Sequence, residues 1–249
     1  MVSAISLIAF VAAPFIGSFL GVLVLRSGDG RPVIVGRSQC DHCQHRLAWR
    51  DLVPVVSWSL LGRRCRYCRA QLSLFYPLIE IAAIILVAWA ATVMTGWLFL
   101  ASAVLGWMLL ALGLIDWRTQ RLPDPLTFSL VAAGLVAAYF LERQNFVGHL
   151  IGAAVGYASF AGVAYVYHAI KGYQGLGLGD AKLLAALGAW LSWQRLPVLV
   201  VLAAVMCLSF ILARALRRSK FIATERVPFG PFLALAGWAI WLYGPLLPF

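Results

Sequence analysis

The chain has few charged residues, and acidic residues are the scarcest. Only 9 of its 249 residues are Asp or Glu, and charged residues of both signs make up 12%. Soluble domains carry about 25% charged residues, so this composition excludes an ordinary soluble protein. Hydrophobic residues make up 63%, and the mean hydropathy is +0.89. These values predict a protein that crosses a membrane several times.

Polar segments are also scarce, and the only long one runs from Arg26 to Tyr76. About 20 residues cross a bilayer as a helix. The charge-free stretch between Glu80 and Asp116 is therefore too long for one span, and we expect it to divide near Thr95-Gly96. About eight spans are predicted, at residues 4–25, 77–94, 97–116, 125–141, 147–170, 181–193, 196–214 and 228–248.

This pattern predicts an all-α polytopic membrane protein with three parts. Residues 1–25 form the first transmembrane helix, residues 26–76 form a polar loop domain, and residues 77–249 form the remaining membrane domain. The sixth span, at 181–193, is the least well defined because it is short and its last residues are polar.

No basic residue precedes the first apolar run, whereas a secretory signal peptide begins with a positive region. We therefore expect a first span whose N-terminus lies outside. The cytoplasmic loops would then be 26–76, 117–124, 171–182 and 214–227, which hold 18 of the 20 Lys and Arg residues. Only Arg143 and Arg195 would lie outside. The positive-inside rule thus accounts for the net charge of +11, and nucleic acid is not expected as a partner.

Cysteine is scarce, yet four of the five cysteines form two pairs, Cys40-Asp41-His42-Cys43 and Cys65-Arg66-Tyr67-Cys68. Four thiolates close a structural zinc site, and a short polar loop needs such a constraint to fold. Redox dithiols or unpaired cysteines are the alternatives, and a reducing cytoplasm argues against disulfides. His42 and His45 are interpreted as surface residues, and Cys207 as a small packing residue.

Two of the rare acids, Asp116 and Asp180, lie at the edges of apolar segments. An ionisable residue at membrane depth costs about 2.5–3.5 kcal/mol on insertion scales, which suggests a function. The predicted topology puts both near the cytoplasmic boundary. Asp116 ends a helix, where the dipole disfavours an acid, and Asp180 follows the glycine-rich segment Gly175–Gly179. Two carboxylates that meet across a helix bundle predict acid–base chemistry on water.

Other polar residues near the predicted spans have structural interpretations. Asp124 precedes Pro125 and is expected to cap a helix. Lys182 is expected to face lipid headgroups, with pairing to a carboxylate as the alternative. Glu80 either caps a helix or contacts the arginine-rich loop. Small residues recur from Gly148 to Gly162, as close helix packing requires.

The chain resembles the type IV prepilin peptidases, the leader peptidase/N-methyltransferases of type IV pili and type II secretion. The resemblance covers essentially the whole length and rests on several motifs in the right order. They are Gly17-Ser18-Phe19-Leu20, the two cysteine pairs, Tyr76-Pro77-Leu78-Ile79-Glu80, Asp116 with Leu122-Pro123-Asp124, Gly177-Leu178-Gly179-Asp180-Ala181-Lys182 and Phe229-Gly230-Pro231.

The resemblance implies an intramembrane aspartic endopeptidase with Asp116 and Asp180 as its catalytic dyad. Its substrates would be prepilins and pseudopilins, cut after a glycine at the end of a short basic leader. The loop 26–76 would carry a second activity, methylation of the new N-terminal amine with S-adenosylmethionine. The protein would lie in the bacterial inner membrane, with a periplasmic N-terminus and lipid as its surroundings.

Three positions depart from the family pattern in and before the loop. Gly21 stands where members usually have Asn, Asp41 where they have Pro, and Arg63 where they have Gly. A leader peptidase without methyltransferase activity is therefore one alternative. A non-catalytic, zinc-stabilised scaffold of the secretion machinery is another. A proton-coupled transporter explains the acids but not the four-cysteine loop.

Overall fold

The computed structural model describes residues 4–27, 38–40, 42–172, 177–217 and 227–244. Regular structure in these ranges is helical, apart from two isolated β-bridges, so the all-α prediction is confirmed. The long helices are α1 (Ala4–Ser27), α3 (Phe75–Val93), α4 (Gly96–Thr119), α5 (Asp124–Leu141), α6 (Phe146–Lys171), α7 (Leu178–Leu191), α8 (Leu196–Arg217) and α9 (Gly230–Tyr243). The short ones are α2 (Val56–Leu60) and the 3-10 turns η1 (Trp49–Leu52), η2 (Arg143–Asn145) and η3 (Trp193–Arg195).

Six helices are long and apolar enough to cross a membrane, so this is a multi-pass membrane protein. They are α1, α3, α4, α5, α6 and α8. The other two predicted segments form α7 and α9, which have 14 residues each. The expected division near Thr95-Gly96 is also confirmed. Gly96 has a φ of +61°, which a residue without a Cβ adopts at no cost, and the chain reverses there between α3 and α4.

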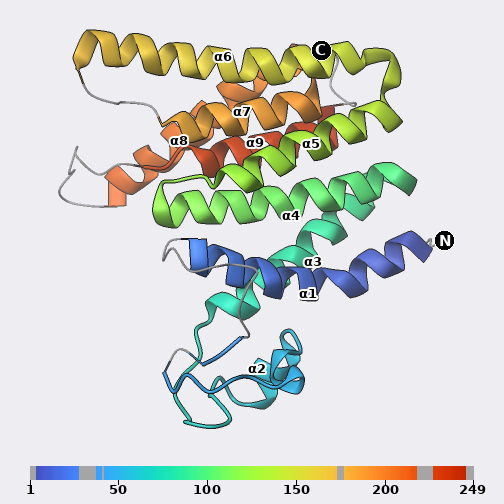
Figure 1. Ribbon diagram of the computed structural model, residues 1–249, viewed down its shortest axis with the longest axis vertical. Helices are drawn as coiled ribbons and strands as arrows, with labels where there is room; N and C mark the ends of the chain where they lie inside the picture. Colours follow the sequence, from blue (N-terminus) through green and yellow to red (C-terminus); the bar gives the residue numbers. More distant parts are fainter. Residues whose placement is uncertain (1–3, 28–37, 41, 173–176, 218–226, 245–249) are drawn as a thin grey trace. The chain divides into compact units, whose positions relative to one another are not determined.

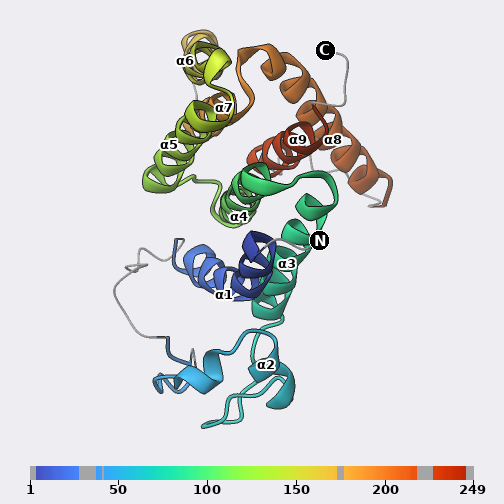
Figure 2. The same ribbon diagram turned by 90° about the vertical axis from the view of Figure 1, so that its right-hand side faces the viewer.

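The chain forms two compact units, Met1–Trp107 and Met108–Phe249. In the first unit α1 packs along α3 (Figure 2). The backbones approach closely, because a Cβ on Gly17 would lie 2.7 Å from the Cα of Glu80. The polar loop between these helices contains η1 and α2.

In the second unit α7 is the central helix, packed by α5, α6 and α9 (Figure 1). Every residue from 183 to 191 is buried. The contact of α7 with α6 depends on glycine, because a Cβ on Gly188 would lie 2.1 Å from the carbonyl oxygen of Gly152. The expected close packing is confirmed at Gly148, Gly152 and Gly156, whereas a Cβ on Gly162 would meet no described atom within 4 Å.

Candidate functional site

Asp116 lies near the C-terminal end of α4 and is only 6% exposed. Its Oδ2 accepts a hydrogen bond of 3.0 Å from the backbone N–H of Gly230, the first residue of α9. A helix N-terminus carries unpaired N–H groups and partial positive charge, so it stabilises an anion. The end of α4 alone would disfavour this acid, and the start of α9 supplies the compensating charge.

Asp180 lies in the first turn of α7 and is half-buried. Its backbone N–H donates to the carbonyl of Gly177 at 3.2 Å, which begins the helix. An acid in a first turn is stabilised by the helix dipole. Both predicted acids therefore stand at the N-terminal end of a helix, Asp116 beside α9 and Asp180 within α7.

Asp116 and Asp180 belong to the same compact unit, and burial, together with the charge of Asp116, raises the pKa of Asp180 to about 7. Like charges at short range disfavour double ionisation, so such a pair holds one proton more readily than none. One member can then accept a proton while the other donates one. This is the combination needed to activate water and stabilise the oxygen of an attacked carbonyl.

The segment between α4 and α5 contacts the start of α7. The Nζ of Lys182 lies 2.5 Å from Oδ1 of Asp124, so the alternative expected for Lys182, pairing with a carboxylate, is confirmed. A Cβ on Gly179 would touch the Leu122 side chain at 3.4 Å. The expected helix cap at Asp124 is wrong. The N-cap position is Pro123, and Asp124 makes no capping bond because it already lies in the helix.

Glu80 joins the helices of the first unit to its loop. The side chain is 4% exposed, and its Oε2 accepts a 2.7 Å hydrogen bond from the backbone N–H of Val55. Of the two expectations for Glu80, contact with the loop is confirmed, although a backbone N–H replaces arginine as the partner. Val55 has a φ of +60°, which is costly for a β-branched residue, and the Glu80 bond helps to hold it there.

The two cysteine pairs fold as matching knuckles. In the first, the N–H of Gln44 donates to the carbonyl of Cys40 at 2.9 Å. In the second, the N–H of Arg69 donates to the carbonyl of Cys65 at 3.0 Å. An antiparallel bridge closes each knuckle, Gln39 with Arg46 and Arg64 with Gln71. The two motifs therefore present their cysteines in the same way.

The four cysteines fit a metal site. The sulfurs of Cys40, Cys43, Cys65 and Cys68 all lie within 4.8 Å of one another, and Cys40 and Cys68 are 3.9 Å apart. Tetrahedral Zn–S bonds of about 2.3 Å place sulfurs about 3.8 Å apart. The backbone N–H of Cys68 hydrogen-bonds the Cys65 sulfur and, against the effect of burial, lowers the pKa of that thiol to about 7. A backbone hydrogen bond from Ala70 lowers the pKa of Cys68, but burial and the neighbouring cysteine side chains outweigh it and raise that pKa to about 11. A thiolate is the form that binds metal.

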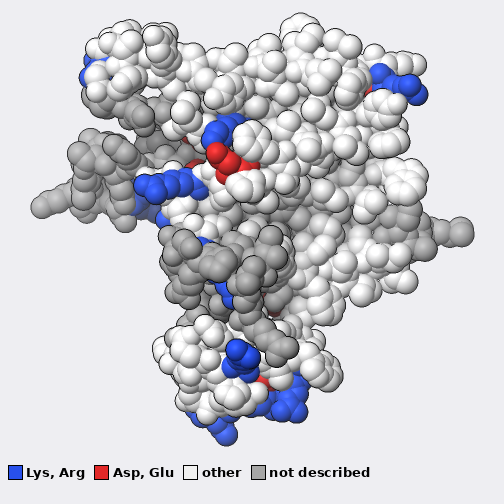
Figure 3. Space-filling view, in the orientation of Figure 1, with Lys and Arg blue, Asp and Glu red and all other residues white. Residues whose placement is uncertain are grey.

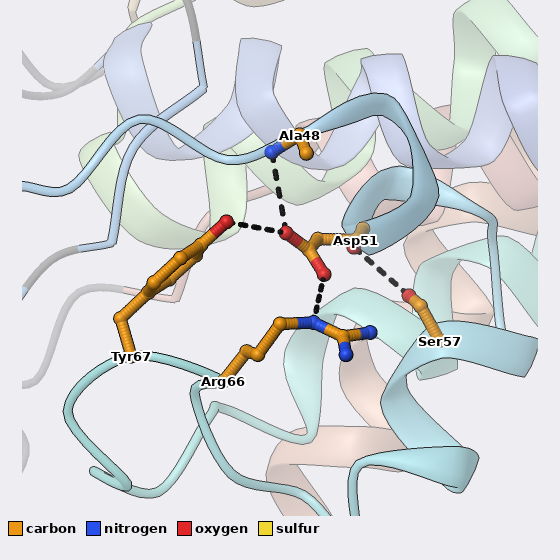
Figure 4. A network of polar contacts seen from close by, with 5 residues as sticks. All are labelled: Ala48, Asp51, Ser57, Arg66 and Tyr67. Carbon is orange, nitrogen blue, oxygen red and sulfur yellow. Dashed lines mark hydrogen bonds and ion pairs between the residues drawn. The ribbon is translucent and has the colours of Figure 1, made fainter.

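Asp51 ties the second knuckle to η1 and α2 (Figure 4). Its carboxylate accepts hydrogen bonds from Nε of Arg66 at 2.7 Å, the N–H of Ala48 at 3.2 Å and the hydroxyl of Tyr67 at 3.3 Å. Burial raises the pKa of Asp51, but these bonds outweigh it and hold the pKa below its usual value. Arg66 and Tyr67 are the residues between Cys65 and Cys68, so Asp51 orients the turn that carries the second cysteine pair.

Comparison with known proteins identifies the family. Residues 11–94 match the bacterial peptidase A24 N-terminal domain, and residues 103–212 match the type IV leader peptidase family. A protein of Aeromonas hydrophila named prepilin leader peptidase/N-methyltransferase is 37% identical over 95% of this chain and 90% of its own length. The chain belongs to the type IV leader peptidase family. The equally named protein of Burkholderia pseudomallei (strain K96243) is 38% identical, over 95% of this chain and 84% of its own length. No solved structure matches significantly.

The features of this leader peptidase that sequence reasoning missed are contacts between distant segments. The bond from Gly230 to Asp116 joins residues 114 positions apart, and the Lys182–Asp124 pair spans 58. A local signal for the first contact does exist at Gly230. Its adjacent proline marks a helix start, and a helix start is a place for an anion. The expected surface positions of His42 and His45 are confirmed.

Proposed function

We propose that this protein cleaves the leader peptides of prepilins and pseudopilins with Asp116 and Asp180 as an aspartyl dyad. Membership of the type IV leader peptidase family and the name shared by its relatives support the reaction. The observation that carries the residue assignment is that both acids stand at helix N-termini and interact electrostatically. A purely structural role would favour a cation partner for each acid. Neither acid has one among the described ion pairs.

In the proposed reaction the ionised carboxylate takes a proton from water while the oxygen of that water bonds to the scissile carbonyl carbon. The protonated carboxyl hydrogen-bonds the carbonyl oxygen as negative charge develops there. Collapse of the tetrahedral species breaks the C–N bond, and a carboxyl proton passes to the leaving amine. The dyad thus ends with the single proton it started with, so either member can play either part.

Gly230 has a positioning role in this proposal. Its N–H bonds one oxygen of Asp116 and so fixes the carboxylate plane, while the other oxygen stays available for water or substrate. A side chain at this position would collide with the carboxylate, because a Cβ would lie 2.6 Å from Oδ2. This close approach accounts for a glycine at the first residue of α9.

We also propose that the protein methylates the amine that cleavage releases, as the names of its relatives suggest. S-adenosylmethionine would supply an electrophilic methyl group. The neutral amine nitrogen would bond to that methyl carbon, the S–C bond would break, and the ammonium would lose a proton to solvent. Cys40, Cys43, Cys65 and Cys68 would hold a structural zinc ion that shapes the loop.

The proposed setting is the bacterial inner membrane, with the N-terminus in the periplasm and the four-cysteine loop in the cytoplasm. The distribution of Lys and Arg residues supports this orientation. A prepilin with a basic leader would then meet the acids from the cytoplasmic side.

Single substitutions test the dyad. Asp116→Asn and Asp180→Asn should each reduce prepilin cleavage by about 1000-fold or more, because residues that act as one unit fail together. Asp124→Asn, which removes an acid from the first turn of α5, should stay within about threefold of wild type and serves as the matched control. Near-wild-type cleavage by either variant would show that Asp116 and Asp180 are not the catalytic dyad.

A separate assay distinguishes the peptidase-only alternative. The purified full chain is incubated with prepilin and S-adenosylmethionine carrying a labelled methyl group, and cleavage and label are both measured. Cleaved and labelled product supports both activities. Cleaved but unlabelled product would remove the transferase from the proposal and leave the peptidase.

A further inference from the structure

A cavity of about 360 Å³ lies in the first unit, where the polar loop meets the N-terminal end of α3. This volume falls within the range of small-ligand sites, about 300–1,000 Å³. The side chains that define its chemistry are His42, Arg63, Gln71, Ser73, Leu74 and Tyr76. The polar members can donate hydrogen bonds, and no acidic residue lies among the described lining residues, so the cavity suits an anion.

The described part of the loop carries more positive than negative charge. From residue 42 to residue 74 the structure describes six arginines but one acid, Asp51, which already accepts bonds from Arg66 and Tyr67. Among the described ion pairs, none involves Arg63. Figure 3 shows the resulting concentration of basic side chains on the loop.

Arg63 is held in a conformation that arginine rarely adopts. Its φ is +64°, which costs a residue with a Cβ about 1–2 kcal/mol. Its N–H donates to the carbonyl of Trp58 at 3.0 Å, and its own carbonyl accepts from Leu72 at 2.8 Å. The guanidinium lies over the Trp58 ring, 5.5 Å from the centroid. Backbone and side chain are thus both held in position, and a strained residue at a cavity suggests a binding role.

The cavity lies where an apolar helix begins. Leu74, Leu78, Ile81 and Ile85 are 47%, 61%, 41% and 56% exposed. Their spacing of three or four residues puts them on one face of α3. Because α3 is long and apolar enough to span a membrane, this face suits acyl chains. The cavity is therefore at the level where headgroups meet the hydrocarbon region.

We propose that this cavity binds the phosphate of an anionic phospholipid, whose acyl chains follow the exposed face of α3. Arg63 supplies planar, always-charged N–H donors that match phosphate oxygens. Basic pockets beside membrane helices favour anionic headgroups in the same way. A free phosphate would share the arginine contact but would gain nothing from the apolar face. S-adenosylmethionine, with two cationic groups and one carboxylate, is a poorer match, because the described lining residues include an arginine and no acid.

Two arginine substitutions form a matched pair for the test. Arg63 and Arg69 are both exposed loop residues with left-handed backbone, at φ values of +64° and +62°, but only Arg63 lines the cavity. Each Arg→Gly change removes one guanidinium and the same backbone strain. The thermal unfolding midpoint of neither variant should fall, since glycine accepts this conformation. A fall in the midpoint of Arg63→Gly alone would mean that Arg63 is structural, against the proposal.

Native mass spectrometry measures the binding of phosphatidylglycerol and of phosphatidylcholine to the detergent-solubilised full chain. We expect wild type to prefer phosphatidylglycerol, Arg63→Gly to weaken that binding about tenfold and Arg69→Gly to weaken it less than about twofold. Inorganic phosphate at the lipid concentration should not compete. Equal effects of the two variants, equal binding of the two lipids, or displacement by inorganic phosphate would each overturn the proposal.

Discussion

At the scale of single residues, the Asp116–Gly230 contact is the most sensitive part of the proposed site. Asp116 is buried and its Oδ2 is held by one backbone N–H. A methyl group on Gly230 would lie 2.6 Å from that oxygen, inside van der Waals contact. The carboxylate or α9 must therefore move when any side chain is added.

Gly230→Ala is expected to lower kcat for prepilin cleavage by about 100-fold, since misplacing a catalytic group by about 1 Å costs that much. The change leaves substrate-binding surfaces in place, so KM should change little. Gly113→Ala is the control at the same α4–α9 contact. Its Cβ would lie 3.6 Å from the Cα of Pro231, an ordinary distance. Equal losses in the two variants would show that helix packing, and not Asp116, is affected.

Which acids to suspect could be predicted from the sequence, because their cost in an apolar segment is a local property. The contacts that hold these side chains in position could not be predicted from the sequence. The partner of Asp116 comes from a helix that begins 114 residues later, and the partner of Lys182 comes from a different helix. Asp124 shows the same limit, since its place before Pro125 predicts a cap, but the structure has it inside the helix and paired with Lys182.

At the scale of helices, the contact between α6 and α7 depends on the absence of side chains. Gly152→Ala would bring a Cβ to 2.5 Å from the carbonyl oxygen of Gly188. Overpacking of this kind costs about 1–3 kcal/mol, so thermal unfolding should occur at a lower temperature. Gly162→Ala, on the same helix with no described neighbour within 4 Å, should stay within about 1 kcal/mol of wild type. A similar loss in both variants would contradict the packing argument.

The connection between α5 and α6 is expected to be sensitive to acid. The buried His149 has Nδ1 3.0 Å from the carbonyl oxygen of Ala189 and Nε2 3.3 Å from Oε2 of Glu142. Both partners can accept hydrogen bonds when Glu142 is ionised. The hydrogen bond from His149 lowers the pKa of Glu142. Burial opposes this shift, and the charges of His149 and Arg195 reinforce it.

A carboxyl whose pKa is lower in the folded state stabilises the fold above its unfolded pKa, about 4.3, and loses this effect as the pH falls through the folded value. Glu142→Gln should therefore lower the free energy of unfolding by about 1 kcal/mol at pH 7 and by less at pH 3. Thermal unfolding of both proteins in detergent at the two pH values measures this. A difference that is the same at pH 3 and pH 7 would argue against the ion pair.

At the scale of the whole molecule, hydropathy predicted where the eight apolar segments lie and that the sixth is short, but not that this segment, α7, is the central helix of its unit. Span prediction needs only composition over about 20 residues, and the division at Gly96 followed from it. The buried α7 and the glycine-dependent packing around it are tertiary properties. Hydropathy scores an apolar residue alike whether lipid or protein surrounds it, so it cannot tell a central helix from a peripheral one.

The two units differ in what stabilises them, and loss of the proposed zinc ion should affect only the first unit. The described loop residues, 38–40 and 42–74, form short helices, two knuckles and the Asp51 network. This is too little buried apolar surface to fold alone. The second unit is held by buried helix contacts around α7.

Cys43→Ser should reduce bound zinc from one ion per chain to about a tenth or less, because a three-thiolate site binds far more weakly. Limited proteolysis should then cut within the loop while the α5–α9 fragment stays intact. Cys207→Ser, which removes the cysteine outside the cluster, should keep the metal and the resistant loop. Full zinc content in Cys43→Ser, or cuts that appear equally in both units, would show that the cluster does not stabilise the loop.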